Sequence, residues 1–151
     1  MDLEPETVVQ GEIGAKYNTS NFAATAAIYL VSLSDRRSVD FINNPNGGVT
    51  EEVFVQSTRT IGVEANVNYQ VAKGVNIYGN GTFQNAQFTE FEGNPELVGN
   101  TPRRQPALIG TLGISVEQGG FDLDLSGNFL GSKFANDANT VELDGYNIIR
   151  G

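Results

Sequence analysis

Alternation of apolar and polar residues with a period of two is the feature that most constrains how this chain folds. Between residues 60 and 70 every second position is apolar or aromatic: Ile61, Val63, Ala65, Val67 and Tyr69. Successive residues of a β-strand point to opposite faces, so this segment would present one apolar and one polar surface. The pattern recurs over residues 9–17 and 121–128. Strands that separate hydrocarbon from a water-filled lumen need this alternation, which therefore predicts an outer-membrane β-barrel.

Turn-forming residues divide the chain into seven predicted strands of an all-β, antiparallel, up-and-down meander. These are residues 6–17, 22–34, 53–70, 75–89, 106–117, 121–134 and 145–151. The connections alternate between tight turns (18–21, 71–74, 118–120) and long polar loops (35–52, 90–105, 135–144). In a meander this alternation sends the short turns to one rim and the long loops to the other, as in transmembrane barrels.

Aromatic residues support this arrangement, because they cluster beside the tight turns. Tyr17 and Phe22 flank the first, Tyr69 precedes the second and Phe121 follows the third. They would form a belt at one membrane interface. Residues 22–33 fit less well, since both faces are apolar near the far end, and a β-bulge or a contact with a plug inside the barrel would explain this.

Composition excludes several function classes. The 151 residues include 18 acidic and 9 basic ones, a formal charge of -9, which argues against a nucleic-acid partner. Cysteine, histidine and tryptophan are absent, so disulfides, Cys/His zinc sites and catalysis by imidazole or thiolate are excluded. The pair Asp122 and Asp124 is more typical of a polar lumen lining than of a glycosidase. We predict no enzymatic activity, no metal and no cofactor.

Short motifs in a matching order resemble those of TonB-dependent outer-membrane receptors. Residues 3–6 (Leu-Glu-Pro-Glu) followed by 11–16 (Gly-Glu-Ile-Gly-Ala-Lys) resemble a Pro-Glu pair that leads into a Glu-x-Gly-x-Lys strand of that family. Residues 57–58 (Ser-Thr) with 62–64 (Gly-Val-Glu) are similar to its returning strand, and 99–102 (Gly-Asn-Thr-Pro) to a loop entering the next one. Residues 134–146 resemble its segment near the C-terminus.

The resemblance implies a piece of a longer receptor with an N-terminal plug and a barrel of about 22 strands. Residues 1–151 would then be a partial, open barrel segment of about seven strands, without the plug and the final strands. Such a receptor lies in the bacterial outer membrane and takes up a scarce nutrient such as a ferric siderophore. Implied partners are outer-membrane lipid and lipopolysaccharide, the remainder of the barrel and plug, and TonB through the plug.

Candidate functional residues fall into three groups. Basic residues in or near the long loops could hold an anionic ligand, or could pair with loop acids or lipopolysaccharide phosphates: Arg36, Arg37, Arg59, Arg103 and Arg104. Lipid-facing positions are Ile61, Val63, Val67, Tyr69, Leu123 and Leu125. Three charged residues, Glu12, Lys16 and Glu64, would face the lumen and form ion pairs across adjacent strands.

Two alternatives belong to other classes of protein. One is a small stand-alone outer-membrane barrel or adhesin. The other is a soluble β-sandwich binding protein, which would bury the apolar faces against each other. The sandwich predicts that Ile61, Val63 and Val67 lie beneath a second layer of the same chain, whereas both membrane hypotheses predict that they stay uncovered.

Overall fold

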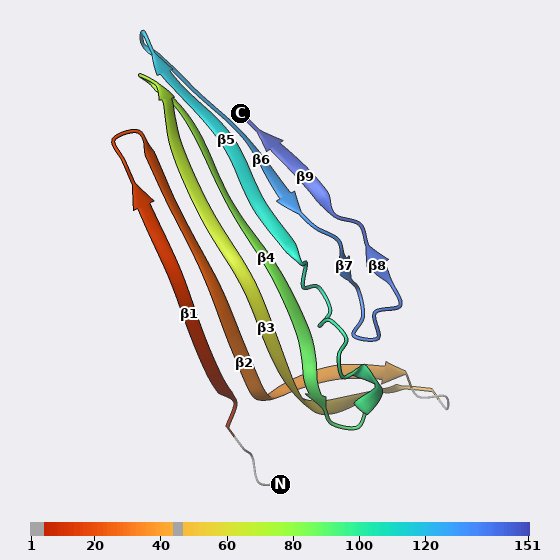
Figure 1. Cartoon of the computed structure of the whole chain (residues 1–151). Helices are drawn as coiled ribbons and strands as arrows, with labels where there is room; N and C mark the ends of the chain where they lie inside the picture. Colours follow the sequence, from red (N-terminus) through yellow and green to blue (C-terminus); the bar gives the residue numbers. More distant parts are fainter. Residues whose placement is uncertain (1–4, 44–46) are drawn as a thin grey trace.

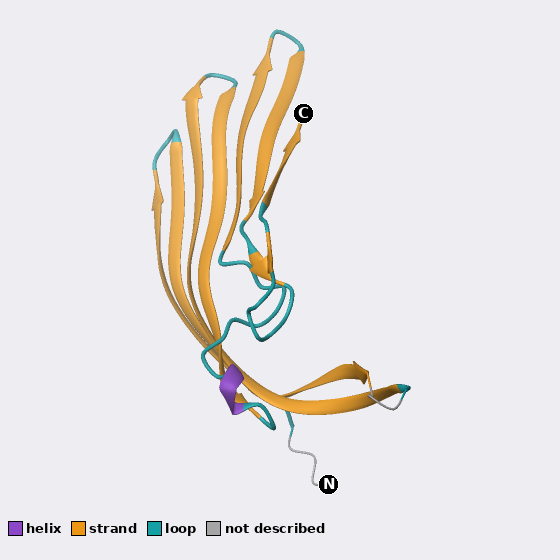
Figure 2. Cartoon of the chain, turned by 90° about the vertical axis from the view of Figure 1, so that its right-hand side faces the viewer, coloured by secondary structure: helices purple, strands orange, loops and turns teal. Residues whose placement is uncertain are grey.

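The computed structural model describes residues 5–43 and 47–151, and in this part of the chain the fold is a single curved antiparallel sheet (Figures 1 and 2). Seven strands pair in the order β1-β2-β3-β4-β5-β6-β9, and β7 pairs with β8 in a small second sheet. The bounds are β1 Thr7–Asn18, β2 Phe22–Asn43, β3 Val49–Ala72, β4 Val75–Phe91, β5 Leu108–Gln118, β6 Phe121–Leu130, β7 Lys133–Phe134, β8 Glu142–Leu143 and β9 Tyr146–Arg150. A 3-10 turn, η1, spans Pro95–Leu97. The predicted open, up-and-down meander is confirmed.

The three predicted tight turns join β1 to β2, β3 to β4 and β5 to β6, and they lie together at the upper end of the sheet in Figure 1. In the first, the Thr19 backbone N–H donates to the Phe22 carbonyl at 2.7 Å. The other two turns contain Gly74 at φ 77° and Gly119 at φ 61°. Glycine adopts this left-handed backbone conformation without a steric penalty, which explains its position in these turns.

The first long loop was predicted wrongly, because residues 35–52 mostly extend β2 and β3 into a longer hairpin. Pairing resumes at Arg36↔Gln56 and continues to Asn43↔Val49, while residues 44–46 lie outside the described residues. A β-bulge between Leu33 and Arg36 resets the register, with Asp35 at φ 60°. The charged run that begins at Asp35 resembles a loop in sequence, but past a bulge a strand can continue with polar residues.

The sixth predicted strand, residues 121–134, was also too long. Pairing of β6 with β5 ends at Ile109↔Leu130, and the Gly131 backbone N–H donates to the Leu108 carbonyl at 2.8 Å. Residues Lys133–Phe134 then pair with β8, which lies inside a predicted loop. Short strands of two residues carry no periodicity, and the sequence pattern therefore could not reveal them.

The strand register places the alternating apolar residues of neighbouring strands on the same face of the sheet. Ile28, Val63 and Phe83 are directly opposite one another on β2, β3 and β4, and Tyr29, Gly62 and Gln84 form the next row on the other face. The apolar side chains remain exposed: Ile61 is 48% exposed, Val63 45% and Val67 41%. No second layer covers them in the described part of the chain, so the β-sandwich alternative is wrong.

The polar face lies on the concave side of the curve. Ala27 and Gly62 on that face are buried, whereas Ile28 and Val63 beside them are exposed, as expected where side chains converge inside a curved sheet and splay apart outside it. The connection between β4 and β5 also lies on the concave side in Figure 2. The Gln84 side-chain amide donates to the Pro106 carbonyl at 3.0 Å, which links the concave face to this connection.

Two tyrosines on the concave face each cover a glycine of the next strand. The Tyr29 ring lies over Gly62, and a Cβ added at Gly62 would overlap the ring. The Tyr78 ring lies over Gly113 in the same way. Each hydroxyl reaches one strand further: Tyr29 donates to Gln84 Oε1 at 3.1 Å and Tyr78 to Asp124 Oδ1 at 2.9 Å. Aromatic side chains of this kind shield a glycine and fix the register of three neighbouring strands.

Replacement of Gly62 by alanine in the complete receptor should therefore destabilise the barrel by about 1–3 kcal/mol, because the Tyr29 ring must move. Gly81 is the matched control, since it lies in the interior strand β4 and an added Cβ would meet only the Ile109 carbonyl oxygen, at 3.8 Å. Urea unfolding in detergent would measure both variants. Equal midpoints for Gly62→Ala and Gly81→Ala would show that the ring does not constrain this position.

Candidate functional site

The apolar outer face forms a band of constant width across six strands. On each strand, five alternating outward positions spanning nine residues carry no charged side chain. These stretches are residues 9–17, 22–30, 61–69, 75–83, 108–116 and 121–129. A tilted strand needs about 9–11 residues to cross the hydrocarbon core of a bilayer. Each strand therefore has the length and the apolar content that a membrane crossing requires.

The band also shifts steadily from strand to strand. In each hairpin with a tight turn, the band of the second strand lies two residues nearer the turn: Tyr17 ends the band of β1 and pairs with Ala24, but the band of β2 begins at Phe22. Between β2 and β3, and between β4 and β5, the bands are level, as the pair Leu30↔Ile61 shows. From β1 to β6 the band therefore shifts by six residues in total over five strand pairs. At about 3.3 Å per residue and about 4.8 Å between strands, a level band then requires a strand tilt of about 40°. Transmembrane barrels have tilts of about 35–45°.

Aromatic rings lie at the short-turn edge of this band. The Tyr17 and Phe22 ring centroids are 6.1 Å apart, and those of Phe22 and Tyr69 are also 6.1 Å apart. Phe121 is 81% exposed beside the third tight turn. Amphipathic and aromatic rings favour the boundary between hydrocarbon and headgroups, so their position is typical of a membrane interface.

The concave face carries carboxylates in a shallow depression. Glu12, Glu64 and Lys16 line a hollow of about 250 Å³ whose other lining residues include Gly14 and Ala27. Among the described residues Lys16 forms no ion pair with Glu12 or Glu64, so the predicted ion pairs are not formed. The two acids are thus available to a partner inside the curve.

Two long connections interlock at the other end of the sheet. The Thr101 backbone N–H donates to Asn139 Oδ1 at 2.8 Å, and the Asn139 side-chain amide donates back to the Thr101 carbonyl at 2.7 Å. The Asn100 amide donates to the Asp137 carbonyl at 3.0 Å. We call this set of hydrogen bonds, which joins residues 100–101 to residues 137 and 139, the clamp. The sequence analysis did not predict it. Its signal was the Asn-Asp-Ala-Asn-Thr run at 136–140, since asparagine and aspartate side chains readily bond to nearby backbone groups.

The predicted ligand-binding arginines lie in three places. Arg36 and Arg37 are exposed on the extended β2–β3 hairpin. Arg103 belongs to the clamp: its backbone N–H donates to Asp137 Oδ1 at 2.8 Å, and its Nε lies 3.6 Å from Asp137 Oδ2. Arg104 is next to it and exposed, and its backbone N–H donates to the Phe134 carbonyl at 2.7 Å. These four side chains are at the long-loop end.

Arg59 differs from the other four. It is opposite Ser32 and Gln87, in the row next to Leu30 and Ile61, and therefore on the outer face just beyond the apolar band. Its guanidinium is exposed there. This position suits contact with lipid headgroups better than contact with a molecule in the lumen.

Aromatic packing anchors the hairpin that carries Arg36 and Arg37. Phe88 is almost fully buried, its ring centroid lies 5.0 Å from that of Phe91, and the Phe54 centroid lies 5.7 Å from Phe91. Arg36 pairs with Gln56, which is buried next to this cluster. The hairpin base is thus the best-packed region of the described chain.

The described residues contain no group of three or more His, Cys, Asp or Glu side chains that could hold a metal ion. No helix in the described ranges is long and apolar enough to cross a membrane.

Comparison with known proteins agrees with this geometry. Residues 1–149 match the family described as TonB dependent receptor-like, beta-barrel. Among solved structures, the unliganded ferric citrate transporter FecA superposes with a TM-score of 0.77 at 25% identity, covering 96% of this chain and 23% of that one. The copper transporter OprC gives 0.75 at 17% identity, covering 98% and 22%.

The ferric yersiniabactin uptake receptor FyuA from Yersinia pestis is similar to a comparable degree. Its TM-score is 0.74 at 17% identity, covering 95% of this chain and 21% of that one. The chain thus spans between a fifth and a quarter of the length of these structures. It belongs to the TonB-dependent receptor β-barrel family, whose members are receptors and transporters of the bacterial outer membrane and not enzymes.

Proposed function

We propose that this chain forms part of the barrel wall and of the ligand rim in a receptor that takes up a scarce nutrient, such as a ferric siderophore, with energy supplied through TonB. The uncharged outer band, with its consistent stagger over six strands, is the observation that carries this proposal. Residues 1–151 would be one portion of the barrel domain, and the remainder of the barrel would pair with the outer edges of β1 and β9.

The outer band would contact acyl chains of the outer membrane. Ile61, Val63, Val67 and Tyr69 on β3, and Leu123 and Leu125 on β6, point outward and are exposed. Exposed apolar surface of this extent is unfavourable in water and favourable in hydrocarbon. Arg59, just beyond the band, would then reach lipopolysaccharide phosphates.

The concave face would contact the plug of the complete receptor. Glu12, Glu64 and Lys16 line a hollow that includes the small residues Gly14 and Ala27, and its excess of negative charge favours a basic side chain of the plug. In this arrangement TonB acts on the plug, and the wall described here stays in place.

The ligand would be an anionic metal chelate. The similar structures include a ferric citrate transporter and a ferric yersiniabactin receptor, and at the long-loop end of this chain Arg36, Arg37 and Arg104 are exposed. Guanidinium groups bind carboxylate and other oxygen anions through paired hydrogen bonds. Arg103, which already contacts Asp137, would hold the rim in shape and would contribute less to binding.

Replacement of Val63 by lysine in the complete receptor should destabilise the folded barrel in bilayers by about 2–4 kcal/mol, because the ammonium lies near the middle of the band. Asn80→Lys is the control, since Asn80 is exposed among polar residues of the concave face. Reversible unfolding in liposomes would measure both. Similar losses for the two variants would contradict the assignment of the faces.

Uptake of radiolabelled iron by cells that express the complete receptor tests the proposed transport function. Ferric citrate and a panel of ferric siderophores should include at least one ligand whose uptake requires both the receptor and TonB. The variant with Arg36→Ala and Arg37→Ala should bind that ligand about tenfold more weakly, since it loses charge-assisted hydrogen bonds. Arg59→Ala should bind normally.

Two results would count against this proposal. Absence of TonB-dependent uptake for every iron chelate would refute iron transport. Loss of binding in Arg59→Ala, with normal binding in the double variant, would place the ligand on a different surface.

A further inference from the structure

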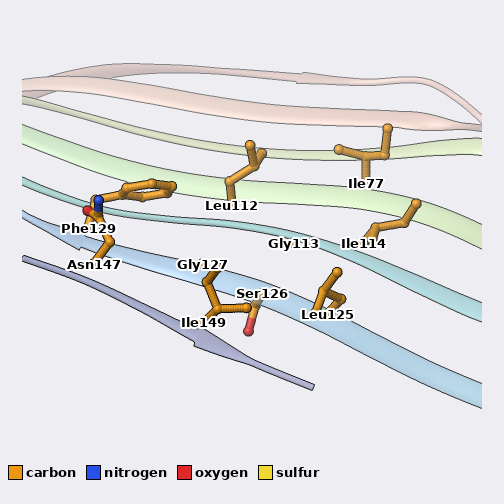
Figure 3. A pocket seen from close by; sticks show the side chains of 10 residues that line it. All are labelled: Ile77, Leu112, Gly113, Ile114, Leu125, Ser126, Gly127, Phe129, Asn147 and Ile149. Carbon is orange, nitrogen blue, oxygen red and sulfur yellow. The ribbon is translucent and has the colours of Figure 1, made fainter.

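The outer face is not uniformly flat, because it contains a long apolar groove near β9. The groove has a volume of about 460 Å³, and Figure 3 shows the side chains that line it. Ile77, Ile114 and Leu125 form one end, Leu112 and Ile149 are in the middle, and Phe129 and Asn147 form the other end. Asn147 is the one polar side chain of this lining on the outer face. The end of the groove with Asn147 is therefore polar, whereas the opposite end is apolar.

Gly127 creates the depth of the groove. Gly79, Leu112, Gly127 and Ile149 form one row across four strands, so Gly127, which has no side chain, lies between the branched side chains of Leu112 and Ile149. The Phe129 ring leans towards Gly127, since a Cβ built there would lie 3.4 Å from Phe129 Cζ. The corresponding row on the first three strands carries Tyr17, Ala24 and Val67, which gives a more even surface.

The groove begins at the long-loop edge of the apolar band. Phe129 is the last outward position of the band on β6, and Asn147 is directly opposite it on β9. From Phe129 to Leu125 the groove extends four residues along β6, or about 13 Å. One leaflet of a bilayer core is about 15 Å deep. At the strand tilt of about 40° this corresponds to a depth of about 10 Å, which is about two-thirds of one leaflet, and the groove has a hydrogen-bonding amide at its headgroup end.

We propose that this groove is a binding site for one acyl chain of lipopolysaccharide, with Asn147 donating a hydrogen bond to the carbonyl that links the chain to its headgroup. This inference rests on the proposed function, which places the outer band in hydrocarbon. The long loops of transmembrane barrels lie outside the cell, so the Phe129 end of the groove faces the outer leaflet. Lipopolysaccharide is the lipid of that leaflet. Apart from Ser126, which alternates with Leu125 and Gly127 and so belongs to the concave face, the remaining lining is apolar. The side chains of Leu112 and Ile149 form ridges on either side of Gly127, and this shape suits a chain.

Binding of lipid to the complete, detergent-purified receptor would test this by native mass spectrometry, with lipid A or phosphatidylethanolamine as the added probe. The wild-type receptor should retain one lipid A. Ile149→Ala lowers one ridge and Gly127→Leu fills the floor, and each should reduce retention about threefold or more through lost dispersion contacts. Phosphatidylethanolamine should be retained less.

Matched controls come from β1. Ile13 is 76% exposed on the outer face and Ile149 is 77% exposed, so Ile13→Ala removes the same side chain away from the groove. Gly11→Leu adds the same side chain at an outward position with nothing within 4 Å of the added Cβ. Both controls should retain lipid A as the wild type does.

Three results would overturn the proposal: no retained lipid A, equal losses in the groove variants and their controls, or preferential retention of phosphatidylethanolamine. The iron-uptake assay distinguishes failure of this lipid-binding proposal from failure of the proposed transport function. A receptor that retains lipid A through the groove but transports no iron would argue only against the proposed nutrient.

Discussion

Cross-strand register is the constraint on which the rest of this structure depends. Each strand alternates between two kinds of side chain, but only a register that aligns Ile28 with Val63 and Phe83 brings the apolar sets together on one face. A slip of one residue in any pair would mix the two faces. The tight turns and the tyrosines that cover Gly62 and Gly113 hold this register at separate heights along the sheet.

Because the sheet has a single layer, its stability cannot come from a dry interior of its own. Buried residues of the described chain are few, and Phe88 and Phe91 lie where the long connections gather. The remaining apolar surface needs an apolar medium, and in hydrocarbon every backbone N–H and C=O also needs a partner. Within the sheet the ladders provide these partners, which explains why the strands stay paired over their full membrane-crossing length.

Sequence periodicity predicted the features that depend on local alternation: the strands that cross the band, the three tight turns and the outward set that includes Ile61 and Leu125. It failed where the chain departs from regular pairing. The bulge at Asp35 allowed β2 and β3 to continue through a charged segment, and the clamp between Thr101 and Asn139 joins residues 38 apart in sequence. Such contacts depend on tertiary placement. The five arginines were similarly grouped by loop position, although the register places Arg59 on the outer face.

The assignment of the outer face to lipid can be tested most directly by spin labels placed one at a time at residues 60–70 of the complete receptor in bilayers. The chain contains no cysteine, so each introduced cysteine is a unique labelling site within it. Accessibility to oxygen should peak at positions 61, 63, 65, 67 and 69, and accessibility to a water-soluble nickel chelate should peak at the positions between them. High nickel accessibility at Ile61, Val63 and Val67, or no alternation at all, would contradict the account.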